Sequence, residues 1–193
     1  IATPPSAGEL SALAGHYVQG GRKLRPVLEA ILAHPALHTG PRMVKPPAVY
    51  MAGMLRTQRR AVDRGDWVWL AEGAGQRLFF PPNVSGWDDE RWLDTSTLRA
   101  RWLAMATLLN GRQIQGTEFN NYDATETPAQ AVAKAKAYWN DPELTSAGAA
   151  QLDAYAATCL PAVMANWQKS QYRAIRQNAL RLLLATSPDL QTC

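Results

Sequence analysis

The chain has 193 residues, of which 47% are hydrophobic and 19% charged, values typical of a globular domain with one apolar core. No run of about 20 apolar residues is present, so the sequence predicts no membrane span. The net charge of +4 is modest. The tightest basic run has helical spacing and no interleaved aromatic residues, which favours a solvated helix face over a nucleic-acid surface: Arg56, Arg59, Arg60 and Arg64.

Apolar residues recur at helical spacing through the first half of the chain. In the second of these segments Pro26 lies in the first turn, and Leu28, Ile31 and Leu32 are expected to face inward. Pro35 follows its end. The sequence therefore predicts four helices, over residues 8–18, 24–33, 46–62 and 66–73.

The second half has the same periodicity. A helix is expected from Thr95 or Ser96 to just before Gly111, which occupies the usual position of a glycine after a helix end. Further helices are expected over residues 128–139, 144–158 and 162–185. No alternating β-branched run exceeds four residues. We therefore predict an all-α fold, an irregular bundle of about seven or eight helices that forms a single domain over 1–193.

A distinctive loop lies between residues 75 and 94. Pro81, Pro82 and Asn83 predict a stiff turn, because each proline fixes its own φ angle. Asn83 is expected to bind the backbone of its own turn, and Gly86 to adopt a positive φ angle. We expect this turn to be the structural hub of the domain.

Five of the seven tryptophans are close together in sequence. Trp102 shares a helical stripe with Met105 and Leu109, and we expect it in the core. Trp67 and Trp69 belong to one short helix and must point to different faces, so we expect one of them to be exposed. An exposed tryptophan, together with Trp87 or Trp92, could form an aromatic binding surface, although packing in the core explains most of this group.

No catalytic motif is found in the sequence. His34 and His38 are separated by Pro35 and cannot share a helix face as a metal pair would. The acids after Gly86 lack the pattern of a calcium loop, and neither a nucleophile elbow nor a phosphate-binding glycine motif is present. The sequence predicts no cofactor, no catalytic metal and no hydrolase activity of this chain alone.

Several blocks resemble the bacterial family known as the domain of unknown function 1800 family. One block is Leu24-Arg25-Pro26-Val27-Leu28, and another is Val44-Lys45 with Pro47. The central block runs from Gly75 through Pro81-Pro82-Asn83-Val84 and Gly86-Trp87 to Trp92, with Thr97, Leu98 and Arg101 in the helix after it. The end resembles the closing block of the family: Leu182-Leu183-Leu184-Ala185-Thr186-Ser187-Pro188 with Gln191.

The resemblance implies a setting and not an activity. Members of this family look exported, which implies a periplasmic or secreted protein, and they are typically encoded beside an exported protein of the alkaline-phosphatase-like superfamily. The chain begins at Ile1 without a Met, and we expect it to be the C-terminal portion of a longer protein.

We therefore expect an exported accessory or binding protein that acts with a partner protein or an envelope polymer. The alternative is a hydrolase of an extracellular polymer, with its site shared with an N-terminal portion. The candidate binding residues are Lys45, Asn83, Trp87, Trp92 and Arg101. Their expected structural roles include an ion pair between Arg101 and a nearby acid.

Overall fold

The computed structural model describes residues 4–39, 42–116, 122–158 and 165–192. These residues form helices, with two isolated β-bridges and no strand. Eight of the α-helices in the described segments have eight or more residues, so the predicted all-α class is confirmed. None of the helices in the described parts of the chain is long and apolar enough to cross a membrane.

The chain divides into two compact units, Ile1–Met43 and Val44–Cys193. The first unit contains α1 (Ala7–Gln19), α2 (Leu24–Leu32) and the short α3 (Ala36–Thr39). A capping box formed by Ser6 and Glu9 begins α1. Neither α1 nor α2 has a buried residue. The inward orientation predicted for Leu28 and Leu32 is therefore wrong, because both are exposed although α2 packs against α1.

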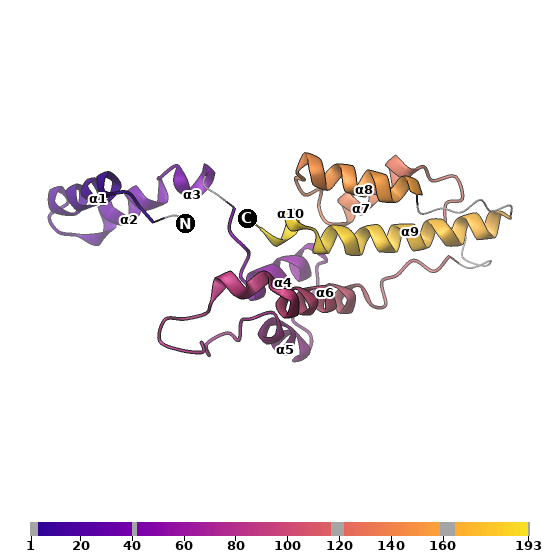
Figure 1. Cartoon of the computed structure of the whole chain (residues 1–193), viewed down its shortest axis with the longest axis horizontal. Coiled ribbons are helices and arrows are strands. Elements are labelled where there is room, and N and C mark those ends of the chain that lie inside the picture. The colour runs from indigo at the N-terminus through magenta and orange to yellow at the C-terminus, as the bar shows by residue number, and fades with distance from the viewer. Residues whose placement is uncertain (1–3, 40–41, 117–121, 159–164, 193) are drawn as a thin grey trace. The chain divides into compact units, whose positions relative to one another are not determined.

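The second unit contains the remaining helices: α4 (Pro47–Thr57), α5 (Asp66–Gly73), the 3-10 helix η1 (Asp89–Leu93), α6 (Thr95–Leu109), α7 (Pro128–Tyr138), α8 (Ser146–Thr158), α9 (Asn166–Thr186) and α10 (Pro188–Gln191). Figure 1 shows α7 and α8 running beside the long α9, while α4, α5 and α6 form a second group that also packs on α9. The apolar core lies between these helices, with Met105, Leu108, Leu180 and Leu184 fully buried.

Helix α4 ends earlier than predicted, at Thr57, because Arg59 adopts a left-handed backbone with φ +49°. The N–H of Arg60 then donates to the carbonyl of Leu55 at 2.9 Å, which closes the helix. The side chain of Arg60 lies over the ring of Trp67 and pairs with Asp63. The predicted single helix face is therefore wrong for this basic run, since the helix does not continue through it. Its solvation is as predicted at Arg56, Arg59 and Arg64, which are exposed.

The buried face of α6 differs from the predicted one. Trp102 is 42% exposed, and Leu98 is exposed as well, so the core position predicted for Trp102 is wrong. The buried face is instead formed by residues spaced three and four apart, with a basic residue among them: Thr97, Arg101, Ala104, Met105, Leu108 and Leu109. Because this face contains Arg101, it does not read as apolar in the sequence.

Candidate functional site

Arg101 lies at the centre of the second unit and is fully buried, with 0% of its surface exposed. Its guanidinium donates three hydrogen bonds: to the carbonyl of Trp92 at 3.0 Å, to the carbonyl of Lys45 at 2.7 Å and to Oε1 of Gln191 at 3.0 Å. One planar fork thus ties η1, the segment before α4 and α10 to α6. Burial lowers the pKa of Arg101, because the guanidinium loses water around its charge.

A ring of contacts surrounds this guanidinium. Tyr50 of α4 lies beneath it, with 5.3 Å between the guanidinium carbon and the ring centroid, and the Tyr50 hydroxyl donates to the carbonyl of Ala185 at 2.7 Å. Lys45 extends its Nζ to the carbonyl of Leu190 at 3.0 Å, and its backbone N–H donates to the carbonyl of Gln191. Lys45, Trp92 and Arg101, three of the predicted site residues, are therefore brought together.

This arrangement corrects two predictions. Arg101 does not pair with an acid among the described residues, because its three acceptors are two backbone carbonyls and an amide oxygen. Nor is the Pro81-Pro82-Asn83 turn the structural hub, because all three residues are exposed. The buried Arg101 fills that role, and it joins the segments that precede α4 and follow α9.

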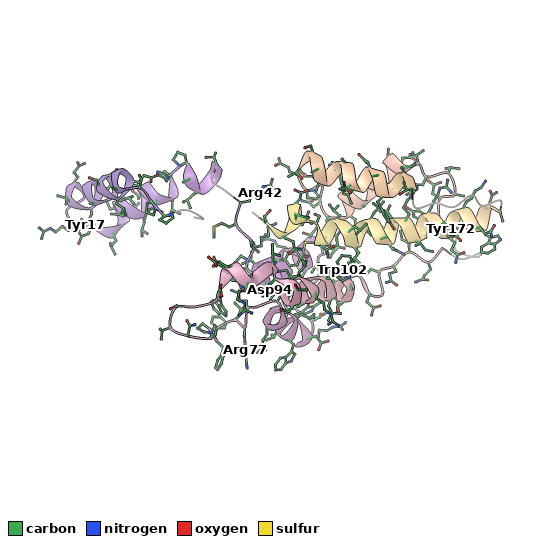
Figure 2. All side chains as sticks on the ribbon, in the orientation of Figure 1. Tyr17, Arg42, Arg77, Asp94, Trp102 and Tyr172 are labelled. Atoms are coloured by element: carbon green, nitrogen blue, oxygen red, sulfur yellow. The ribbon has the colours of Figure 1, made fainter. Side chains whose placement is uncertain are left out.

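Trp92 forms the base of the loop that carries the two other predicted residues. Its side chain is buried, and its Nε1 donates to the carbonyl of Gly75 at 3.4 Å. Gly75 has φ +100°, and a Cβ there would lie 2.9 Å from the Trp92 ring, so glycine is required for this approach. Asp94, labelled in Figure 2, caps α6, and the N–H of Thr97 and the hydroxyl of Ser96 lower its pKa to about 2.

Asn83 and Trp87 occupy the far part of this loop. The Asn83 side chain accepts from the N–H of Ser85 at 2.8 Å, so the predicted contact with its own turn is confirmed. Gly86 has φ +96°, as predicted. Trp87 is half-buried, and its buried Nε1 has no hydrogen-bond partner among the described residues. Neither Asn83 nor Trp87 is among the residues that Arg101 contacts.

The loop also carries a surface that the sequence did not reveal, which we call the apolar loop and define as residues 77–84. Phe79 is 94% exposed and Phe80 67%, while Leu78 is half-exposed and Val84 fully exposed. Figure 1 shows the loop projecting from the α4–α6 group, between α5 and η1. No other described segment exposes so many large apolar side chains in succession.

Arg77 stiffens the start of the apolar loop. Its guanidinium carbon lies 4.9 Å from the ring centroid of Phe80 and 5.9 Å from that of Trp69, which α5 supplies and which is 65% exposed. Figure 2 shows Arg77 at the edge of this group of helices. Trp67, by contrast, is buried, so the prediction that one member of the Trp67/Trp69 pair is exposed is confirmed.

The exposure of Asn83 yields a test. Replacing Asn83 by Ala should lower the free energy of unfolding by less than about 1 kcal/mol, because the hydrogen bond that it removes lies in water. Gly86→Ala is the matched control: no atom is close enough to clash, but φ +96° should cost it about 1–2 kcal/mol. Thermal denaturation measures both, and a larger loss for Asn83→Ala would restore the turn as the hub.

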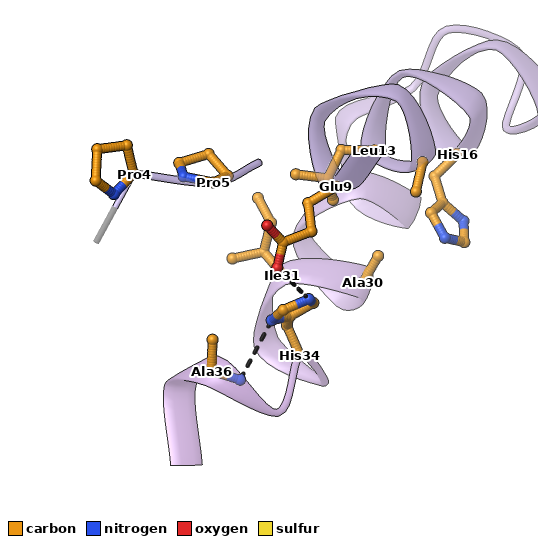
Figure 3. Close-up of a pocket in the computed structure, with 10 residues that line it drawn as sticks. Pro4, Pro5, Glu9, Leu13, His16, Ala30, Ile31, His34 and Ala36 are labelled. Atoms are coloured by element: carbon orange, nitrogen blue, oxygen red, sulfur yellow. Dashed lines mark hydrogen bonds and ion pairs between the residues drawn. The ribbon is translucent and has the colours of Figure 1, made fainter. Parts of the chain in front are cut away.

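A pocket of about 360 Å³ lies within the first unit, between α1 and α2. Figure 3 shows Glu9 and His34 facing each other in it, with Glu9 Oε1 at 3.3 Å from His34 Nε2. The other ring nitrogen, Nδ1, accepts from the N–H of Ala36 at 3.2 Å. Because both nitrogens of His34 are engaged, the pair joins the start of α1 to the end of α2 and leaves no free ring nitrogen for a substrate.

A second buried polar cluster was also missed by sequence reasoning. Glu126 has a fully buried carboxylate that pairs with Arg176 of α9 at 3.0 Å and with Lys134 of α7 at 3.0 Å, and it accepts from the Tyr122 hydroxyl. Burial, and next the bond to Glu126, raise the pKa of Tyr122. Glu126 lies in the connection between α6 and α7, which reads in the sequence as a polar surface segment, so no signal pointed to it.

The described residues contain no group of three or more His, Cys, Asp or Glu side chains that could hold a metal ion. A family model described as "Protein of unknown function (DUF1800)" matches residues 1–192. No curated protein and no solved structure matches the chain.

Proposed function

Because the chain belongs to the DUF1800 family, whose function is unknown, we propose from its surface that it is an accessory binding protein that contacts a partner protein through the apolar loop. The main observation behind this proposal is that Phe79, Phe80 and Val84 are exposed in one short segment. Contiguous exposed apolar side chains are rare on proteins that act alone, and they mark sites of interaction.

The construction of the loop supports this proposal. Trp92 and Gly75 fix its base, and Arg77 stacks on Phe80 and Trp69, so the aromatic rings are held before a partner arrives. A surface that is already ordered loses less entropy on binding. Phe79 also has a backbone φ angle of +62°. Residues with a Cβ seldom adopt this conformation, and where they do it is often at functional sites.

A protein suits the apolar loop better than a polysaccharide does. Sugar rings stack on aromatic faces, but their hydroxyl groups also need polar partners beside those faces. The exposed tip offers Leu78, Phe79 and Val84, and the nearby Asn83 side chain already binds its own turn. Aromatic anchors of this kind fill apolar pockets on a partner protein.

The setting of this interaction is a further part of the proposal. The family resemblance supports export to the periplasm or the medium, with the neighbouring exported alkaline-phosphatase-like protein as the partner. The hydrolase alternative requires Asn83, Arg101 and a carboxylate to converge in a cleft. Since Asn83 is exposed and Arg101 is buried among three oxygen acceptors, no observation favours that arrangement.

The test measures binding of the purified chain to the purified alkaline-phosphatase-like protein by biolayer interferometry. The double variant Phe79→Ser/Phe80→Ser should bind at least about tenfold more weakly, because each buried phenyl ring contributes about 1.5–3 kcal/mol. Trp167→Ser is the control, since Trp167 is an exposed aromatic residue of α9 outside the apolar loop.

A parallel sedimentation assay with an isolated envelope polysaccharide separates the two classes of partner. Sedimentation that depends on Phe79 and Phe80 would replace the protein partner by a polymer. Equal binding of the double variant and the parent chain, or absence of binding in both assays, would reject the apolar loop as the contact surface.

A further inference from the structure

A separate cavity of about 300 Å³ lies in the second unit, between the end of α6, residues 112–113 and the middle of α9. Its lining is mainly aliphatic, with two arginines and two amides: Ala106, Leu109, Arg112, Gln113, Ile175, Asn178, Ala179, Arg181 and Leu182. This volume lies at the lower end of the range for small-molecule sites.

Arg181 is the unusual member of this lining. Its guanidinium carbon lies 4.1 Å from the ring centroid of Tyr138, and its Nε is buried without a hydrogen-bond partner. Its two terminal nitrogens are not among the buried atoms without a partner and remain accessible to solvent. A buried Nε–H without an acceptor is costly to keep unless a bound group supplies one.

The last carbonyls of α6, at the same end of the cavity, accept hydrogen bonds from other groups. The carbonyl of Ala106 accepts from the N–H of Asn110, and that of Leu109 accepts from the N–H of Arg112. The carbonyl of Leu108 accepts from Arg60. The donors to these carbonyls are Asn110, Arg112 and Arg60, and Arg181 is not among them.

The second arginine is held in place by a fixed backbone. The Asn178 amide accepts from the N–H of Ile114 at 2.9 Å and donates to the Ile114 carbonyl at 2.9 Å, which attaches this segment to α9. Arg112, two residues earlier, donates one bond to the carbonyl of Gln58, and its other N–H groups have no acceptor in the described parts of the chain. Arg112 and Arg181 thus approach one cavity from different elements.

We propose that this cavity binds a small organic carboxylate with an apolar body, whose carboxylate is held by Arg181 and Arg112. Guanidinium groups match the two oxygens of a carboxylate, and the bond is strengthened by charge. The aliphatic walls, which include Ile175, Ala179 and Leu182, favour a ligand with an apolar body over a small, fully hydrated anion. Glu126, a carboxylate whose charge acts on Arg181, is already paired with Arg176 and Lys134.

A carboxylate of this kind has two sources, a free organic acid and the C-terminus of a peptide. Phenylbutyrate represents the first and N-acetyl-leucine the second, with phenylbutanol and N-acetyl-leucinamide as their neutral counterparts. Titrations of the whole chain are followed by amide chemical shifts and by calorimetry. At least one acid should bind about tenfold more tightly than its neutral counterpart, as loss of a charge-assisted bond implies.

Three variants decide the assignment. Arg181→Gln and Ala179→Leu should each weaken binding about tenfold or more, the first by removing the cation and the second by filling the cavity while keeping both arginines. Arg99→Gln, an exposed arginine of α6 outside the cavity, should bind as the parent chain does. If Arg181→Gln fails to fold after losing its contact with Tyr138, Ala179→Leu alone decides.

Equal affinity for the acids and their neutral counterparts would overturn the proposal. So would an equal loss of binding in Arg99→Gln and Ala179→Leu, or no saturable binding of either acid by the parent chain in the millimolar range. Shift changes confined to residues 106–113 and 175–182 would place the bound acid in the cavity, whereas changes confined to other residues would refute that location.

Discussion

Replacement of Arg101 by Met is expected to lower the free energy of unfolding by about 3–5 kcal/mol, because three hydrogen bonds are lost at once. The substitution leaves the carbonyls of Trp92 and Lys45 and the Gln191 amide oxygen buried without a donor. Each such group costs about 1–3 kcal/mol when it is left unpaired. Loss of the contact with Tyr50 adds to this cost.

Urea denaturation followed by circular dichroism measures this effect. Arg101→Lys should also be destabilised, because a single ammonium cannot reproduce the planar fork that reaches three acceptors. Arg99→Met is the control: this neighbouring arginine of α6 is exposed, and its loss should change stability by less than about 0.5 kcal/mol. Similar stabilities of Arg101→Met and Arg99→Met would show that Arg101 is not the hub.

Arg101 and the helices around it show which structural features can be predicted from the sequence and which cannot. Helices α4, α6 and α7 are predictable because Pro47, Thr95 and Pro128 lie at their starts and apolar residues follow at helical spacing. The residue that caps α6 is Asp94, however, and not Thr95 or Ser96. The partners of Arg101 are not predictable, because two of them are backbone carbonyls and every residue has one. The residue type does not reveal which backbone carbonyl accepts a hydrogen bond from a distant arginine, so the sequence predicts an acidic partner instead.

The same limit explains the errors on surface and core. Trp102 is expected in the core because it shares a helical stripe with Met105 and Leu109, yet the buried face of α6 runs through Arg101 and Met105. Phe79 and Phe80 carry the same apolar character but lie on a projecting loop. Their exposure depends on tertiary packing, which determines which apolar side chains are covered by other residues. A buried arginine and exposed phenylalanines are therefore the features that the structure adds.

The Glu126–Arg176 pair should show strong coupling between its two partners. Both side chains are fully buried and lie 3.0 Å apart, and Arg176 also donates to the carbonyls of Glu126 and Ala156. Glu126→Gln leaves the Arg176 charge without its counter-ion, and Arg176→Met leaves the buried carboxylate with Lys134 alone. Each single variant should therefore lose about 3 kcal/mol or more, because a fully buried charge loses its buried counter-ion.

The double variant Glu126→Gln/Arg176→Met should lose less than the sum of the single losses, by about 1–3 kcal/mol, because neither buried charge remains. Urea denaturation of all four chains gives this coupling energy, and Asp153→Asn, an exposed acid of α8, serves as the control. Single losses that simply add would mean that the two charges do not stabilise each other. The contact of α9 with the segment before α7 would then depend on the carbonyl of Glu126, which also accepts from Arg173 at 2.9 Å.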